Sequence, residues 1–167
     1  MSERDLAIVR TFGFPVYLSR DTEVEFVGLS SQSHNGRVDV VEASYVTPPR
    51  SDHDCDQPSI WTWRAGGLDP AGSLRIHAST HLTSHRADFR SGAHIPSSAE
   101  MDSLGDAIEA SPRRPISVTA GELTLGGWGI DLDGWTLAVL RASGALVTIA
   151  GRREFAEKGL LSSRSDN

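Results

Sequence analysis

Three histidines at a spacing of four residues, His77, His81 and His85, are the side chains that most directly suggest chemistry in this sequence. Imidazole nitrogens are common ligands of zinc and other transition metals. In a helix, residues four apart lie about 6 Å apart on one face, so two of these histidines could share an ion. In a strand the same residues would lie about 13 Å apart, which no single ion bridges. The secondary structure of residues 74–86 therefore decides what the histidines can do.

The alternation of apolar and polar residues in this segment favours a strand over a helix. One face would hold Leu74, Ile76, Ala78, Thr80 and Leu82, and the other Arg75, His77, Ser79, His81, Thr83 and His85. A helix would put Ile76 on the opposite side from Leu74, and it would contain many Ser and Thr residues, which are poor in helix interiors. We therefore expect a half-buried antiparallel strand with an apolar inner face.

The residues before this segment favour a hairpin. Asp69-Pro70-Ala71-Gly72 has the residues that a type I turn prefers, although Asp-Pro can also begin a helix. A hairpin closed there pairs Trp63 with Ala78 and Trp61 with Thr80, so that both tryptophans join the apolar face. The opposite face would be polar, and it is either a solvated surface or a binding face. The residues of the predicted binding face are Arg64, Arg75, His77, His81 and His85.

A metal site on this face would need further ligands, and the loop at 47–59 is the candidate source. Its Asp52-His53-Asp54-Cys55-Asp56 run resembles the first half of a calcium loop, but Gln57 replaces the turn glycine and Trp63 stands where the glutamate belongs. The candidate ligands are then His77, His81 and His85 with His53, Asp52 and Asp54, and zinc is the cofactor that these ligand types favour.

Composition indicates one ordinary domain. A hydrophobic share of 38% and a charged share of 23% over 167 residues fit a single soluble domain, which we place at residues 1–161, followed by a frayed tail at 162–167. The net charge of −6 argues against a nucleic-acid partner, and no apolar run is long enough for a membrane helix. One cysteine, Cys55, and the absence of a signal-like amino terminus predict a cytoplasmic protein.

Two-residue turn signals predict hairpins in a mainly β fold. Asn35-Gly36 separates two strand-like segments, and Asp133-Gly134 and Ser143-Gly144 separate three more, with Ala120-Gly121 before them. We expect one antiparallel sandwich or partly closed barrel in which the strands at 135–142 and 145–150 are central, because they are apolar on both faces. The proline-rich loop at 47–59 is expected to be mobile.

One or two short helices complete the expected fold. Ser97 or Ser98 can cap a helix that Pro112 ends, and a second helix is possible around residues 152–161. Residues 5–18 are apolar without a clear period, and Pro15 and Gly13 interrupt them, so we expect strands there. The four tryptophans are expected to be core anchors.

No complete catalytic constellation is present, and Lys158 is the only lysine. We therefore expect a small non-catalytic binding or interaction protein with a protein partner, such as an inhibitor, an immunity-type protein or an assembly subunit. The alternative is a metal-binding protein that uses the histidine face and the 52–56 loop. A third possibility is a small-molecule carrier with its ligand inside the barrel.

Overall fold

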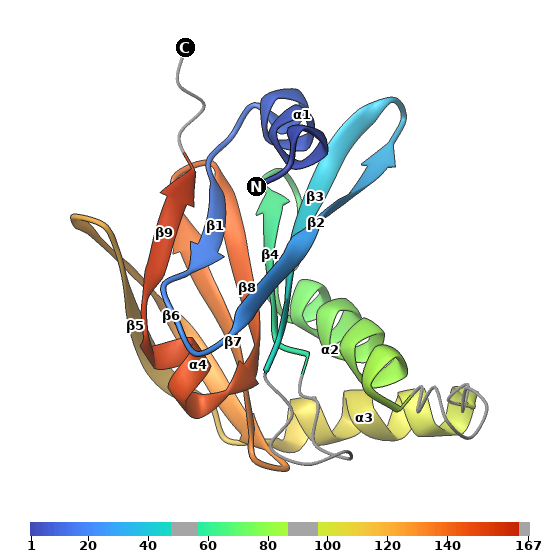
Figure 1. Cartoon of the computed structure of the whole chain (residues 1–167). Coiled ribbons are helices and arrows are strands. Elements are labelled where there is room, and N and C mark those ends of the chain that lie inside the picture. Colours follow the sequence, from blue (N-terminus) through green and yellow to red (C-terminus); the bar gives the residue numbers. More distant parts are fainter. Residues whose placement is uncertain (48–56, 87–96, 164–167) are drawn as a thin grey trace.

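The computed structural model describes residues 1–47, 57–86 and 97–163, with only the helical backbone for 81–86. Nine strands form one curled sheet, a half-barrel, with helices packed against it (Figure 1). The strands are β1 (Val16–Ser19), β2 (Glu25–His34), β3 (Arg37–Val46), β4 (Ser59–Arg64), β5 (Arg114–Ala120), β6 (Leu123–Leu132), β7 (Trp135–Ala142), β8 (Ala145–Arg152) and β9 (Leu160–Ser163). The helices are α1 (Glu3–Phe12), α2 (Pro70–Arg86), α3 (Ser98–Ala110) and α4 (Arg153–Glu157).

The predicted mainly β, partly closed barrel is confirmed. The strands lie in the order β1-β9-β5-β6-β7-β8-β4-β3-β2, and all neighbours are antiparallel except β5 and β9. β8 lies near the centre, between β7 and β4, and both β7 and β8 are buried on both faces as expected. Within the described ranges, no helix has the length and apolar character needed to cross a membrane.

The hairpin turns form where the sequence predicts them. Asn35 and Gly36 have φ values of 51° and 76°, and Asp133 and Gly134 have 52° and 80°, as a tight two-residue turn requires. β7 and β8 are joined at Ser143-Gly144. The hairpin of β5 and β6 also forms, but its turn lies one residue later than expected, at residues 121–122. The meander of the carboxyl half is thus set by local turn chemistry.

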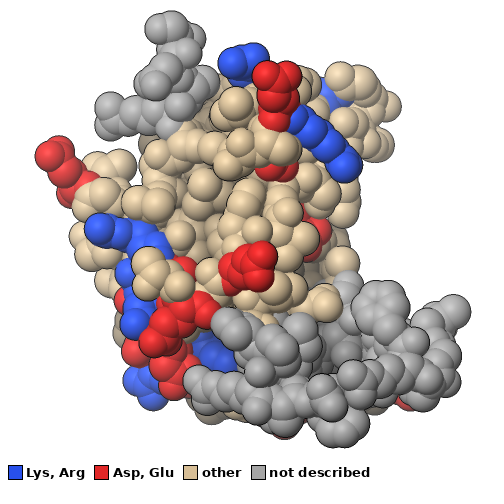
Figure 2. Space-filling view, viewed as in Figure 1, with Lys and Arg blue, Asp and Glu red and all other residues tan. Residues whose placement is uncertain are grey.

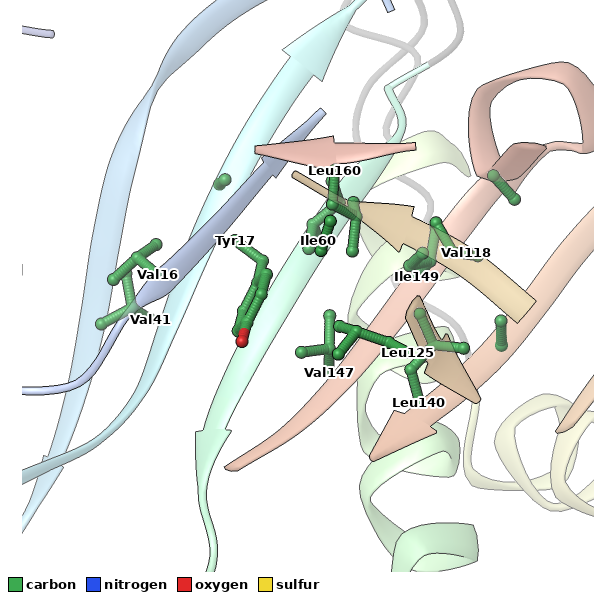
Figure 3. Close-up of a cluster of buried hydrophobic side chains, with 14 of the residues drawn as sticks. Val16, Tyr17, Val41, Ile60, Val118, Leu125, Leu140, Val147, Ile149 and Leu160 are labelled. Carbon is green, nitrogen blue, oxygen red and sulfur yellow. The ribbon is translucent and has the colours of Figure 1, made fainter. Parts of the chain in front are cut away.

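The inner face of the curled sheet is filled by its own hydrophobic core (Figure 3). Side chains of β3, β4, β7 and β8 meet those of β1, β5 and β9 there, with α1 and α4 packed against them. β1 crosses this face: the backbone N–H of Tyr17 donates to Thr62 Oγ1 at 3.2 Å, and that of Ser19 to the Tyr45 hydroxyl at 2.8 Å. Burial raises the pKa of Tyr45 to about 12. The space that a small-molecule carrier needs inside the barrel is occupied by these side chains.

The outer face carries a second core, formed with α2 and α3. Its buried residues are Val40, Trp61, Trp63, Leu74, Ala78, Ile108, Ile130, Leu137, Val139, Leu146 and Ala150. The two helices pack over β6, β7 and β8, and Trp61 and Trp63 of β4 are buried with them. Burial of these two tryptophans agrees with their predicted role as core anchors.

The predicted strand at 74–85 is wrong, because these residues belong to α2. Asp69 caps the helix: its carboxylate accepts hydrogen bonds from the backbone N–H groups of Ala71 and Gly72 at 3.2 and 3.0 Å, so Asp-Pro begins a helix here. The side chains of Leu74, His77 and Ala78 are buried, and Ile76 is 52% exposed on the other side. The predicted pairing of the tryptophans with this segment is also wrong, since β4 pairs with β3 and β8.

Both ends of the chain also differ from expectation. Residues 3–12 form α1 rather than a strand, because Ser2 and Asp5 make a capping box and Gly13 ends the helix with φ 72°. The carboxyl-terminal helix is shorter than expected and β9 follows it, so that Ser162 and Ser163, assigned to a frayed tail, pair with β1. Ser59, assigned to the mobile loop, begins β4, and residues 48–56 lie outside the described part of the chain.

Asp5 connects α1 to the edge strand β2. Its carboxylate accepts hydrogen bonds from the backbone N–H of Leu29 at 2.9 Å and from that of Ser2 at 2.8 Å. The hydrogen bond from Leu29 is the main reason why the pKa of Asp5 lies below its ordinary value of 3.8. The ionised carboxylate therefore stabilises both the helix start and the sheet edge.

Substitution Asp5→Ala should lower the free energy of unfolding by about 1–3 kcal/mol, because it removes the helix-capping carboxylate and the partner of the buried Leu29 N–H. Since the folded-state pKa of Asp5 is lowered, the stabilisation is present above the unfolded pKa and is lost as the pH falls through the folded one. Urea unfolding should give a constant difference between wild type and variant from about pH 5 to 8 and a smaller one below about pH 4. The exposed control Asp106→Asn should change stability by less than about 0.5 kcal/mol at every pH.

Candidate functional site

His77 lies in the outer core rather than on an exposed polar face. It is 1% exposed, and its ring stacks on the indole of Trp61 with 4.5 Å between centroids and 21° between planes. Its Nε2 lies 2.7 Å from Ser59 Oγ, and its Nδ1 lies 2.7 Å from Thr148 Oγ1. One imidazole of α2 thus contacts β4 and β8 at the same time.

The hydroxyl of Thr148 extends this network. It accepts a hydrogen bond from Trp63 Nε1 at 3.0 Å while it contacts His77. In the neutral ring one nitrogen donates and the other accepts, and either assignment satisfies both hydroxyl contacts. Because both ring nitrogens already face hydroxyl groups, His77 has no nitrogen lone pair directed to a metal ion. The network instead secures α2 on the sheet.

A serine hydroxyl next to an imidazole is also the arrangement of a nucleophile and its general base. Here the third group is the hydroxyl of Thr148 rather than a carboxylate, and Ser59 and His77 are only 4% and 1% exposed. The geometry fits a structural network better than a catalytic pair.

The other residues of the predicted binding face point to different neighbours. Arg64 donates to the backbone oxygens of Val38 and Phe12 at 3.2 and 2.9 Å, next to α1. Arg75 lies against α3, 3.9 Å from Asp102 and 3.6 Å from Glu109. These two arginines and His77 therefore do not form one face, and their proposed joint surface does not exist in this arrangement.

The remaining candidate metal ligands cannot be placed. The side chains of His81 and His85 lie outside the described residues, and so do Asp52, His53 and Asp54. Within the described ranges, no group of three or more His, Cys, Asp or Glu side chains is arranged to hold an ion. The backbone of α2 does reach Arg86, so His81 and His85 are four residues apart on one helix.

A groove opens on the outer face between α2 and the strands β2, β3 and β4. It encloses about 280 Å³. Its described lining comprises Val27, Glu42, Ser44, Tyr45, Val46, Gln57, Pro58, Ser59, Trp61 and Thr80. Ser59 and Trp61 also contact His77, so the groove borders the hydrogen-bond network of the outer core.

Two polar groups stand out in the groove. Glu42 and Trp61 are cross-strand partners of β3 and β4, and such pairs have Cβ atoms about 5 Å apart on one face. The Nε1 of Trp61 is buried, and it finds no hydrogen-bond partner among the described residues. Trp63, two residues further along β4, does have a partner in Thr148. An unpaired buried donor is uncommon and calls for an explanation.

The sequence did not identify this groove. Glu42 and Trp61 become neighbours only because β3 pairs with β4, across a connection that no short-range turn signal specifies. In the alternating segment 37–46, Glu42 lies on the other face of the strand from its neighbours Val41 and Ala43, which are buried. This alternation is the one signal that could have identified Glu42 as a carboxylate on the outer face. No local sequence feature distinguishes Trp61 from Trp63 as the tryptophan whose Nε1 has no partner among the described residues.

Comparisons with family models, with curated proteins and with solved structures give no match to this chain in any of the three.

The network around His77 predicts a large effect for a small substitution. Thr148→Val keeps the volume but removes the hydroxyl that contacts both His77 and Trp63, leaving a ring nitrogen and an indole N–H without this partner. The free energy of unfolding should fall by about 2–4 kcal/mol, measured by urea denaturation with tryptophan fluorescence. The same substitution at the exposed Thr124 of β6 should change it by less than about 0.5 kcal/mol. An equal effect at both positions would contradict the network.

Proposed function

We propose that this chain is a non-catalytic binding protein that receives a protein partner in the groove beside α2. The observation that carries the proposal concerns Trp61, which lines a hollow of about 280 Å³ and whose buried Nε1 finds no hydrogen-bond partner in the described part of the chain. A buried donor without a partner costs free energy, and a bound ligand that offers an acceptor removes that cost. An inhibitor, an immunity-type protein or an assembly subunit would each use such a site.

The rest of the molecule is consistent with binding rather than catalysis. The Ser59–His77 contact is buried, and the inner face of the half-barrel is filled by its core. The net charge of −6 suits a partner with basic groups and disfavours nucleic acid. With its single cysteine, we further propose that the protein acts in the cytoplasm.

Site-specific photocrosslinking in the native cell tests the location of the partner. Val27 lines the groove and is 62% exposed, so a benzoylphenylalanine at this position tolerates replacement and faces the proposed partner. Leu123, in the hairpin of β5 and β6, is 60% exposed and serves as the matched control. We expect a discrete adduct with one protein from position 27 and none from position 123. Equal crosslinking from both positions, or none from position 27, would contradict the proposal.

A second candidate function is zinc binding by His81 and His85, which the helical backbone of α2 favours because residues four apart share one helix face. It would require further ligands, for which Asp52, His53 and Asp54 remain the proposed source. Protein purified without a histidine tag should then show a higher Tm on addition of zinc, since a ligand of the native state stabilises it. The shift should disappear in the double variant His81→Ala, His85→Ala and persist in His34→Ala. Absence of any shift in the wild type would contradict zinc binding.

A further inference from the structure

We infer that the groove receives a basic side chain of the protein partner, with its cationic group on Glu42 and a neighbouring carbonyl oxygen on Trp61 Nε1. The inference rests on the proposed function and names the chemistry of the partner at that site. It follows from the charge, the hydrogen-bonding needs and the size of the groove.

Glu42 is the only charged residue in the described lining of the groove. Its carboxylate accepts hydrogen bonds from Ser30 Oγ at 3.3 Å and from Ser44 Oγ at 3.1 Å. Both donors are neutral hydroxyl groups, and no ion pair joins Glu42 to an arginine or lysine of the described chain. The two serines hold the carboxylate in place without neutralising it. A partly buried carboxylate of this kind favours a cationic group as its ligand.

Trp61 adds the opposite requirement. Its Nε1–H is a donor only, so the group that satisfies it must be an acceptor. Glu42 on β3 and Trp61 on β4 are cross-strand partners, so the acceptor and the donor belong to adjacent residues of the groove lining. A peptide segment with a basic residue offers both complements, because its backbone carbonyl lies close to the start of a long cationic side chain. A free carboxylate would satisfy Trp61 but would be repelled by Glu42.

The groove is large enough for one long side chain and lies at the lower limit of the size of small-molecule pockets. Pockets for drug-sized ligands enclose about 300–1,000 Å³, and a water molecule takes about 30 Å³. A hollow of about 280 Å³ therefore holds one long side chain with a few water molecules. Val27 and Val46 provide apolar surface for the methylene groups of such a side chain.

The inference depends on this local carboxylate and not on a charged surface as a whole. Acidic and basic side chains gather near α1 and around α4 on the face shown in Figure 2, where they lie beside one another. Such mixed surfaces give little preference for a partner of one sign. Specificity for a cation must then come from a fixed carboxylate such as that of Glu42.

NMR titration of the ¹⁵N-labelled full chain with N-acetyl-arginine N-methylamide tests the inference at one atom. The chain has four tryptophans, so the indole spectrum is simple, and Trp61→Phe assigns the Nε1–H signal by its disappearance. We expect a saturable shift of the Trp61 signal with the arginine probe. The matching citrulline probe keeps the length and planar shape of the side chain but carries a neutral urea, in which an oxygen replaces one guanidinium nitrogen, and it should bind about tenfold more weakly.

Glu42→Gln should weaken binding of the arginine probe about tenfold, because the amide keeps the serine contacts but not the charge. Glu122→Gln, at the exposed β5–β6 turn, should leave binding within about twofold of the wild type. Equal binding of the two probes, unchanged binding in Glu42→Gln, or no shift of the Trp61 signal would each overturn the inference. Crosslinking from position 27 with any of these results would leave the proposed function standing and the basic side chain excluded. Probe binding without crosslinking would instead count against the proposed function.

Discussion

The stacking of His77 on Trp61 fixes how the helical layer lies on the sheet. The aromatic contact brings α2 against β4, and the two ring nitrogens then reach one hydroxyl on β4 and another on β8. Because the imidazole is almost fully buried, each of these contacts is made without competition from water. Hydrophobic packing alone would allow α2 to slide along the sheet, since burial of apolar surface has no preferred direction. The directed contacts of one histidine remove that freedom.

The position of α2 also determines where a groove can exist. A curled sheet of nine strands has two faces, and its inner face is covered by the sheet itself together with β1, α1 and α4. The outer face depends on α2 and α3, which lie against the sheet (Figure 1) and contact β6 to β8. The tryptophans of β4 are buried in the same outer core. In the described structure, β3 and β2 lie beyond most of the surface that these two helices cover, and Thr80 of α2 forms one side of the resulting hollow. The groove is therefore a consequence of a sheet that is wider than its helical layer.

Features set by neighbouring residues could be predicted from the sequence, and features set by distant contacts could not. Asn35-Gly36 and Asp133-Gly134 form their turns because positive φ values are a local requirement. The helix from Ser98 follows from its cap at Ser97 and a single apolar stripe. The mainly β class and the central place of β7 and β8 followed from the same kind of signal.

The secondary structure of α2 was predicted wrongly because its buried face includes the polar residues His77 and Ser73. Their side chains find hydrogen-bond partners only in the folded molecule. From the sequence these residues count as solvent-facing, and the apolar positions that remain happen to alternate as in a strand. For the same reason the groove was not foreseen, since its composition depends on the order of β2, β3 and β4 in the sheet. Polar residues buried by long-range contacts are thus the point at which periodicity gives the wrong answer.

The indole nitrogen of Trp61 is not needed for the packing of α2 on β4. Its aromatic contact with His77 needs only a ring, and a phenylalanine could offer one without a polar atom. The indole nitrogen adds a buried donor that lacks a partner in the described chain, at an expected cost of about 1–3 kcal/mol to the free protein. Stability alone would favour the simpler ring, whereas the nearby Trp63 has its nitrogen fully used by Thr148. A ligand that supplies an acceptor changes this balance, because the donor that weakens the free protein then strengthens the complex.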